Sequence, residues 1–204
     1  MSDFTLAFKR TMQFEDDPND PGRVTHDAGG GTRFGIADRF HPGLPEEFWT
    51  GSADEARALA EEIELEQYWK PLNLDGIDDQ TVASKIFDMG VNMGAHQAAV
   101  LAQRAVNFLL AIGGPHASLT GGAQEPLTGG TQQPPAAARF VPVVTHLTED
   151  GVIGPKTLKQ LNKLGPARIL KALREFSESH YRHIVAVNPA QAVNLDGWLR
   201  RAAA

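Results

Sequence analysis

Residues 113–139 divide the chain into two parts that must fold from separate segments. Within this stretch, LTGGAQEP (119–126) is followed directly by LTGGTQQP (127–134), an eight-residue near-repeat. Such a sequence cannot bury a core, so it predicts a flexible insert, and two short copies are too few for a solenoid. We therefore expect a domain over residues 1–112, a flexible insert over 113–139 and a second module over 140–204.

Hydrophobic periodicity on both sides of the insert predicts a mainly α protein. Residues 3–15 place Phe4, Phe8 and Met12 on one helical face, which also carries Glu15 at its end. Ser52 followed by Glu55 forms a capping box, and the helix that it begins should continue to about Trp69 and stop at Pro71. Further helices are expected from Asp79 to 94, over 95–112, from Gly154-Pro155 onward, over 165–186 and over 194–202. A small β element, with a short strand over 32–36, is expected near residues 24–38.

Composition narrows the class of function. The formal net charge is −6, which argues against non-specific nucleic-acid binding because such binding needs a basic face. The chain contains no cysteine, so neither a disulfide nor a thiol takes part in its chemistry. Residues 1–10 lack the apolar run of a signal peptide. No stretch approaches the ~20 apolar residues of a membrane span.

Glu15 is the first candidate for chemistry. Cleavage of a glycosidic bond needs a carboxylic acid that protonates the leaving oxygen, together with a second group that activates water or stabilises the oxocarbenium ion. Glu15 follows Phe14 at the end of an apolar helix face, where the chain turns into a loop rich in Asp, Pro and Gly. An apolar wall of this kind raises the pKa of such an acid. The alternative is a helix-end glutamate that is simply solvated.

The segment that follows Glu15 carries a family resemblance. Residues 27–36, DAGGGTRFGI, resemble the D-x-G-G-x-T-x-[YF]-G-I motif of glycoside hydrolase family 108, which contains phage endolysins and bacterial secretion-activator proteins. In that family the motif follows a glutamate at the end of the first helix, and the layout is similar to that of phage lysozymes. The resemblance implies an α+β lysozyme-like fold, with Glu15 as general acid, Asp27 as second carboxylate and Thr32 as the residue that places water.

Other segments extend the resemblance over most of the chain. Residues 68–94 resemble the family's segment between its hairpin and its central helix, and residues 150–158 and 197–202 resemble the type 3 peptidoglycan-binding module usually fused to it. The implied reaction is that of an N-acetylmuramidase of the lysozyme type, which hydrolyses the β-1,4 bond between N-acetylmuramic acid and N-acetylglucosamine. Phe34, Tyr68 and Asn92 are the candidate substrate contacts. Tyr68 has a core position as its alternative, and Asn92 a hydrogen bond at a helix bend.

Two alternatives stay open. After Glu15 the chain reads Asp16-Asp17-Pro18 where the family has Gly-Gly-Tyr, so a non-catalytic peptidoglycan-binding protein, structural or secretion-accessory, is the rival. Asp20 begins a second, poorer copy of the motif, DPGRVT, but only the Asp27 copy continues into Phe-Gly-Ile. A second carboxylate favours hydrolysis over a lytic transglycosylase, which can work with one glutamate. Added carboxylates at positions 16 and 17 would raise the pKa of Glu15 by like-charge repulsion.

The remaining expectations concern partners. The seven histidines are scattered and show no HExxH or similar spacing, so we expect no metal and no cofactor. The glycine run at 29–31 lacks the Lys-Ser/Thr of a phosphate loop. The expected partner is the glycan strand of peptidoglycan, bound by a monomer. A chain without a signal peptide would be made in the bacterial cytoplasm and would reach the wall by export or holin-type release.

Overall fold

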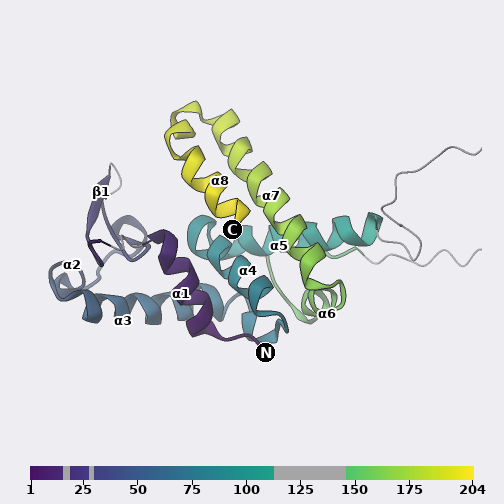
Figure 1. Ribbon diagram of the computed structural model, residues 1–204, viewed down its shortest axis with the longest axis horizontal. Coiled ribbons are helices and arrows are strands. Elements are labelled where there is room, and N and C mark those ends of the chain that lie inside the picture. Colours follow the sequence, from purple (N-terminus) through teal and green to yellow (C-terminus); the bar gives the residue numbers. More distant parts are fainter. Residues whose placement is uncertain (16–18, 28–29, 113–145) are drawn as a thin grey trace, which may run out of the picture.

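A computed structural model describes residues 1–15, 19–27, 30–112 and 146–204. Helices dominate the described chain, and a small sheet lies at one end of the molecule, on the left in Figure 1. This arrangement confirms the expected mainly α, lysozyme-like class. The α-helices are α1 (Phe4–Glu15), α2 (Glu46–Thr50), α3 (Ala53–Glu64), α4 (Gln80–Met93), α5 (Ala95–Ile112), α6 (Pro155–Lys163), α7 (Pro166–Val187) and α8 (Leu195–Ala203). The shorter helical turns are η1 (Asp38–Phe40), η2 (Leu65–Trp69), η3 (Leu74–Gly76) and η4 (Pro189–Asn194).

The sheet is a three-stranded antiparallel meander of β1 (Thr25–Asp27), β2 (Gly30–Arg33) and β3 (Ile36–Ala37). The single strand expected over 32–36 is wrong, because the chain turns in the middle of that range. Phe34 (φ 49°) and Gly35 (φ 77°) both adopt left-handed backbone, which ends β2 and reverses the chain into β3. The turn therefore sits where the motif carries its Phe-Gly pair.

The capping signals predicted from the sequence are present in the structure. The Ser52 hydroxyl accepts the N–H of Glu55 at the start of α3, and the helical path continues through η2 to Trp69. Asp79 caps α4 by accepting the N–H groups of Thr81 and Val82. Gly94 (φ 88°) separates α4 from α5, as expected for a break at that position.

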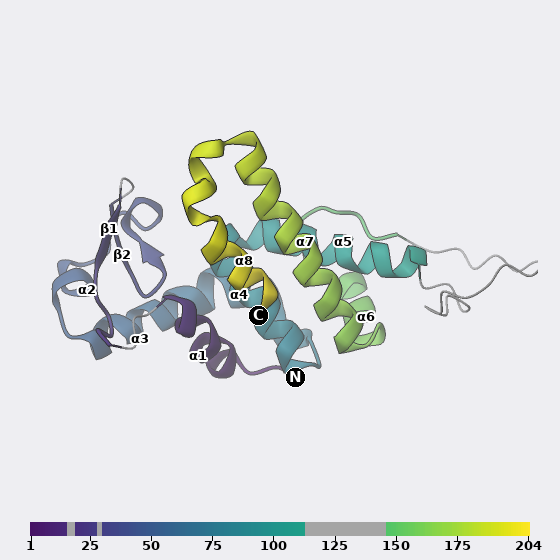
Figure 2. The same cartoon turned by 45° about the horizontal axis from the view of Figure 1, so that its top comes forward.

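The C-terminal helices pack directly on the N-terminal half. Helix α7 lies against α4 and α5, and α8 folds back along α7 (Figures 1 and 2). Ile153, Leu161 and Ile169 belong to the same buried hydrophobic cluster as Phe87 and Leu101. The described residues of both halves thus share one core, which fixes α8 relative to α1.

Polar contacts hold the end of α8 against the first helices. The buried Lys85 ammonium donates to the carbonyls of Arg201 and Ala202, at 2.6 and 2.9 Å. Arg10, within α1, donates to the carbonyl of Ala204 at 2.7 Å, so the C-terminus lies against the first helix. Burial lowers the pKa of Lys85 to about 8, although the nearby Asp88 carboxylate opposes that shift.

The insert predicted over 113–139 lies outside the described residues. The described segments on either side of it contact each other at α5, where the Asn107 amide accepts the N–H of Leu147 at 2.7 Å and donates to the Leu147 carbonyl at 3.0 Å. Among the described residues, no helix is both long enough and apolar enough to span a membrane.

Candidate active site

Glu15 lies at the point where α1 meets the β2–β3 turn. Its side chain is 17% exposed, so the carboxyl group is within reach of solvent yet held by its surroundings. A Cβ atom on Gly35 would lie 3.2 Å from Cδ of Glu15. Only glycine leaves room for the carboxyl group at this turn, and the positive φ of Gly35 adds a second reason for glycine there.

Arg201 fixes the Glu15 carboxyl group from the far end of the chain. Its Nη2 lies 2.6 Å from Oε1 of Glu15, a charge contact that lacks the alignment of a hydrogen bond. Its Nε donates a well-aligned hydrogen bond to Oδ1 of Asp88 in α4, at 2.8 Å. One buried guanidinium therefore ties the last helix to two carboxylates on α1 and α4.

Glu64 is a second carboxyl group at the same place, and the sequence analysis did not select it. Its side chain is 0% exposed, and within the described part of the chain neither oxygen has a hydrogen-bond partner. Its Oε1 would lie 3.3 Å from a Cβ on Gly35, so Glu15 and Glu64 approach the same point of the turn. Burial, followed by the negative charge of Glu15, raises the pKa of Glu64 well above its ordinary 4.5, and Arg201 offsets part of this shift. The protonated, neutral form of Glu64 is therefore favoured up to a higher pH than in a solvated glutamate.

A signal for Glu64 was present in the sequence. Ala56, Ala60 and Glu64 are spaced four residues apart, and all three are buried on the inner face of α3. A glutamate that continues a stripe of small residues on an otherwise charged helix is the pattern of a buried acid. Asp88 and Arg201 carried no comparable signal, because their partners are distant in the sequence.

The hairpin residues predicted for catalysis have different placements. Thr32 is half-buried in β2, opposite Thr25 on one side and Ala37 on the other. Asp27 ends β1, and its backbone pairs with Gly30 at the start of β2. Glu15 adjoins the turn that follows the end of β2, so the backbone of Asp27 lies at the opposite end of a strand roughly 10 Å long. The Asp27 side chain and residues 16 and 17 lie outside what the structure describes, while Asp20 is exposed.

Phe34, expected to contact substrate, lies in the core instead. Its ring is 3% exposed and packs between the guanidinium groups of Arg33 and Arg57, whose carbons lie 5.8 and 5.7 Å from the ring centroid. Arg33 is itself buried and donates to the carbonyls of Gly22 and Phe48. Phe34 therefore shapes the site through the turn that it anchors, because it offers no free face to a sugar.

Of the other two expected contacts, Tyr68 lies near the carboxyl groups and Asn92 lies beside a cavity. Tyr68, on η2, is half-buried, and the charges of Glu64 and Glu15 add to burial in raising the pKa of its phenol. Asn92, near the end of α4, donates to the hydroxyl of Tyr181 at 2.5 Å. Asn92 also lines a cavity of about 580 Å³, which brings it to the same side of the molecule as Arg201.

This cavity lies between the N-terminal helix and the C-terminal module. Its lining comes from the end of α1, the end of α4 and the η4–α8 segment. The described lining residues are Gln13, Phe14, Asn92, Val193, Asn194, Asp196, Gly197, Trp198, Arg200 and Arg201. Because Arg201 also contacts Glu15, the cavity adjoins the candidate acid.

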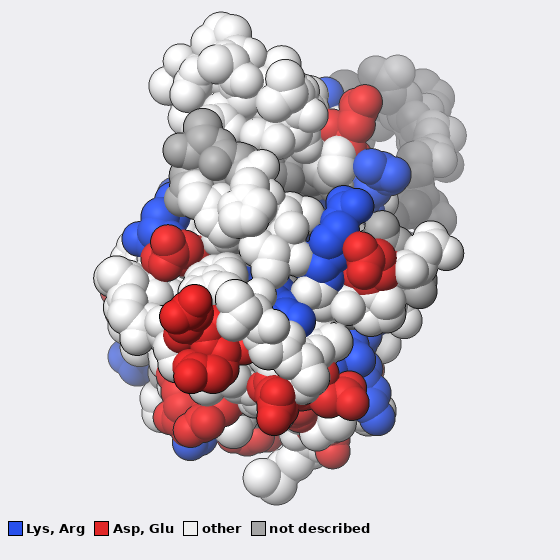
Figure 3. Space-filling model, turned by 90° about the vertical axis from the view of Figure 1, so that its left-hand side faces the viewer, with Lys and Arg blue, Asp and Glu red and all other residues white. Residues whose placement is uncertain are grey.

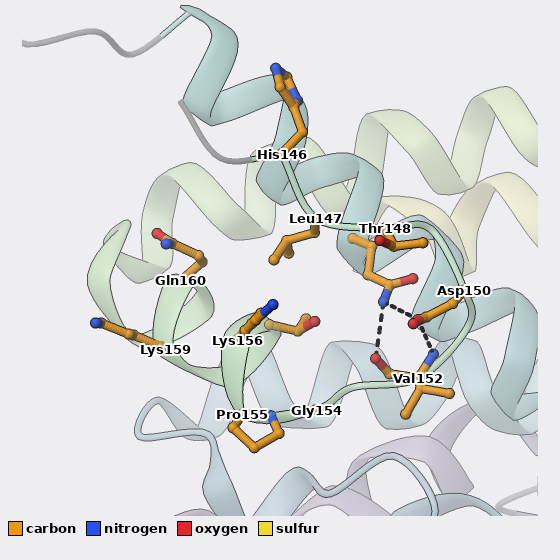
Figure 4. Close-up of a pocket in the computed structure, with 12 residues that line it drawn as sticks. His146, Leu147, Thr148, Asp150, Val152, Gly154, Pro155, Lys156, Lys159 and Gln160 are labelled. Carbon is orange, nitrogen blue, oxygen red and sulfur yellow. Dashed lines mark hydrogen bonds between the residues drawn. The ribbon is translucent and has the colours of Figure 1, made fainter. Parts of the chain in front are cut away.

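A second cavity, of about 610 Å³, lies between α5 and the beginning of the C-terminal module. Its described lining comes from α5, from the segment 146–154 and from the first turns of α6. The Gln103 amide donates to Oδ1 of Asp150 and to the carbonyl of Val152, which ties this segment to α5 (Figure 4). These contacts hold the Asp-Gly turn in front of α6.

Charge is distributed unevenly over the surface. Acidic side chains gather on the lower part of the face seen in Figure 3, where α2 and α3 begin with exposed acids (Glu46, Glu47, Asp54 and Glu55). Arg200 and Arg201 lie instead in the last turn of α8, beside the cavity. The acidic first turns of α2 and α3 thus contrast with the two arginines beside the cavity, whose lining also includes Asp196. Within the described ranges no three His, Asp or Glu side chains group as metal ligands.

Comparisons with known proteins agree with this architecture. Residues 9–94 match the family model described as glycosyl hydrolase 108, and residues 140–203 match the one described as a predicted peptidoglycan domain. The solved structure of Brucella abortus SagA is similar in fold: the two chains are 19% identical, with a TM-score of 0.55 over 98% of this chain and 92% of that one. A comparison with curated proteins finds no match.

Proposed function

Because this chain belongs to the glycosyl hydrolase 108 family over residues 9–94 and carries a peptidoglycan domain over residues 140–203, we propose that it is an N-acetylmuramidase. The two matches support a peptidoglycan hydrolase in general. Our proposal names the bond: the β-1,4 linkage between N-acetylmuramic acid and N-acetylglucosamine, cleaved by general acid catalysis. The wall is the site of action, and release through a holin, as for a phage endolysin, is part of the proposal.

Glu15 is the proposed general acid, and its position is the observation that carries the proposal. Its carboxyl group ends the first helix, reaches solvent and adjoins both the hairpin turn and the 580 Å³ cavity. Glu15 gives its proton to the leaving oxygen and is left as a carboxylate, which the Arg201 guanidinium 2.6 Å away stabilises. A neutral Glu64 adds no repulsion to that charge. Glu15 must take up a proton from solvent before the next cleavage.

Asp27 is the proposed second carboxylate, with Thr32 helping to place the attacking water. The strand length between the backbone of Asp27 and the turn beside Glu15 favours a separated pair over the close pair of a retaining enzyme. In an inverting enzyme the two carboxyl groups lie roughly 6.5–9.5 Å apart, with water between them. Asp20, exposed before the hairpin, is the alternative carboxylate.

The test is Glu15→Gln, which keeps the size and the neutral shape of the acid but removes its proton. Turnover of labelled peptidoglycan should fall on the order of 10²–10⁴-fold, with an unchanged melting curve. Analysis of the released muropeptides should show reducing N-acetylmuramic acid ends. Anhydro ends would instead identify a lytic transglycosylase, and full turnover by a folded Glu15→Gln protein would refute the role of Glu15.

A non-catalytic peptidoglycan-binding protein remains the second candidate, favoured by one observation. The Glu15–Arg201–Asp88 cluster is also what a purely structural ion pair would look like, since it joins α1, α4 and α8. If the protein is non-catalytic, the wild-type chain will bind wall material and release no muropeptides.

A further inference from the structure

The cavity beside Arg201 has the composition of a sugar-binding subsite. Phe14 from α1 and Trp198 from α8 supply aromatic surface, while Asn92, Asp196 and Arg200 supply an amide, a carboxylate and a guanidinium. Ligand sites of this kind combine apolar area with a few placed polar groups. Phe14 is 41% exposed, which is high for a phenylalanine, and a ligand in the cavity would cover it.

Trp198 is held as a flat platform. One face of its indole stacks on the Tyr181 ring, with centroids 5.3 Å apart and planes 22° from parallel. Tyr181 is buried and its hydroxyl accepts from Asn92, so the ring beneath Trp198 is fixed by α4. Trp198 is half-exposed and lines the cavity. A rigid indole of this kind can stack on the C–H face of a hexose ring at little entropic cost.

The polar groups around Trp198 fit an N-acetylated, acid-bearing sugar. Asn92 uses its N–H group for Tyr181, which fixes the amide, and its Oδ1 is an acceptor suited to the N–H of an acetamido group. Arg200, exposed at the rim, matches the carboxylates that peptidoglycan carries on its lactyl and peptide groups. The chemistry of the lining therefore favours an aminosugar of the wall over a neutral glucan.

We propose that α8 and η4 form a saccharide subsite at this cavity. In this subsite Trp198 stacks on an N-acetylhexosamine ring adjacent to the glycosidic oxygen that Glu15 protonates. This proposal rests on the proposed function. It gives the C-terminal module a direct part in binding the strand that is cut, through Trp198 and Arg200, besides any anchoring to the wall.

The experiment measures steady-state turnover of soluble, labelled glycan strands by wild-type, Trp198→Leu, Trp198→Phe and Phe108→Leu proteins. Trp198→Leu should raise KM on the order of tenfold while kcat changes little, and Trp198→Phe should restore most of the affinity because it keeps an aromatic face. Phe108→Leu is the matched control: like Trp198, Phe108 is accessible to solvent (41% exposed) and contacts another aromatic ring, but it lies on α5, outside the cavity. Its KM should match that of the wild-type protein.

A second measurement covers the case in which Trp198→Leu does not fold. The indole N–H resonance of Trp198 in wild-type protein, assigned by its loss in Trp198→Phe, should shift on titration with an N-acetylglucosamine oligomer. No shift, or an unchanged KM in folded Trp198→Leu with normal wild-type turnover, would overturn the subsite and leave the muramidase assignment standing. A shift without any turnover would support the subsite and refute the enzyme.

Discussion

Glu15 and Glu64 converge on Gly35: the Cδ of one and the Oε1 of the other each lie within 3.3 Å of the point where a Cβ on that glycine would stand. One carboxyl group reaches solvent and contacts Arg201, and the other is fully buried. Two carboxyl groups in such proximity are best accommodated when one of them is neutral. Because Glu64 is fully buried it cannot touch substrate, and any influence on the reaction would act through Glu15 and the turn at Gly35.

Glu64→Gln tests this arrangement through the pH dependence of stability. Since its folded-state pKa is raised above 4.5, the folded protein binds more protons than the unfolded chain above that pH, and stability falls as pH rises toward the folded-state value. Glutamine cannot ionise, so Tm of Glu64→Gln minus Tm of wild type should grow from pH 4 upward and then level off. Glu62→Gln, at an exposed position of the same helix, controls for the loss of one charge. A difference that is flat with pH would contradict a neutral Glu64.

Arg201→Gln should be strongly destabilising. It leaves Asp88 and Glu15 without their cation in a site where the three side chains are 8–17% exposed. Breaking a buried ion pair from one side costs about 3–5 kcal/mol, or roughly 6–20 °C in Tm for a domain of this size. The control is Arg182→Gln, which removes an exposed i,i+4 pair with Glu178 and should change stability by about 0.5 kcal/mol or less. Equal melting points for the two variants would show that the Arg201 cluster contributes no more to stability than an exposed ion pair does.

The two copies of the motif can be separated by activity. Asp27→Asn should remove most of the turnover, and Thr32→Ala should cost less because a hydroxyl places water without carrying charge. Asp20→Asn is the built-in comparison and should turn over labelled peptidoglycan like wild type. An inactive Asp20→Asn beside an active Asp27→Asn would assign the second carboxylate to Asp20. Loss confined to Glu15→Gln would favour a single-carboxylate reaction.

The near-repeat predicts that residues 113–139 are dispensable for the core. Replacing them with a short Gly/Ser loop should leave Tm nearly unchanged, because Asn107 already holds Leu147 beside α5 and the loop has only a short distance to close. Limited proteolysis of the wild-type chain should cut first within this range. A fall of several degrees in the shortened protein would show that the segment packs.

Local patterns were sufficient for the helices. The periodicity of residues 3–15 and the caps at Ser52 and Asp79 are effects of neighbouring residues, so the sequence predicted α1, α3 and α4 closely. The turn at Phe34-Gly35 was missed because a phenylalanine rarely adopts positive φ. There, contacts with Arg33 and Arg57, from outside the turn, accompany the strained backbone.

The site itself was predictable only in part. Glu15 and the hairpin motif are local in sequence, and Glu64 was readable from its helical spacing. Arg201 and Asp88 are 113 residues apart, and nothing in either segment names the other as its partner. Nor does the sequence indicate that the indole of Trp198 stacks on Tyr181 and lines the cavity. Long-range pairs of this kind become visible only in three dimensions.

The joining of α1 to α8 sets the order in which the protein can mature during synthesis. A ribosome adds about 5–20 residues per second, so Glu15 is incorporated roughly 10–40 seconds before Arg201. Contacts between distant segments also form late, since the loop between them must first be closed. A nascent or prematurely terminated chain would therefore carry the acid without its guanidinium and without the wall of the cavity that α8 supplies. Completion of translation would then set the earliest time at which the proposed hydrolytic activity could appear.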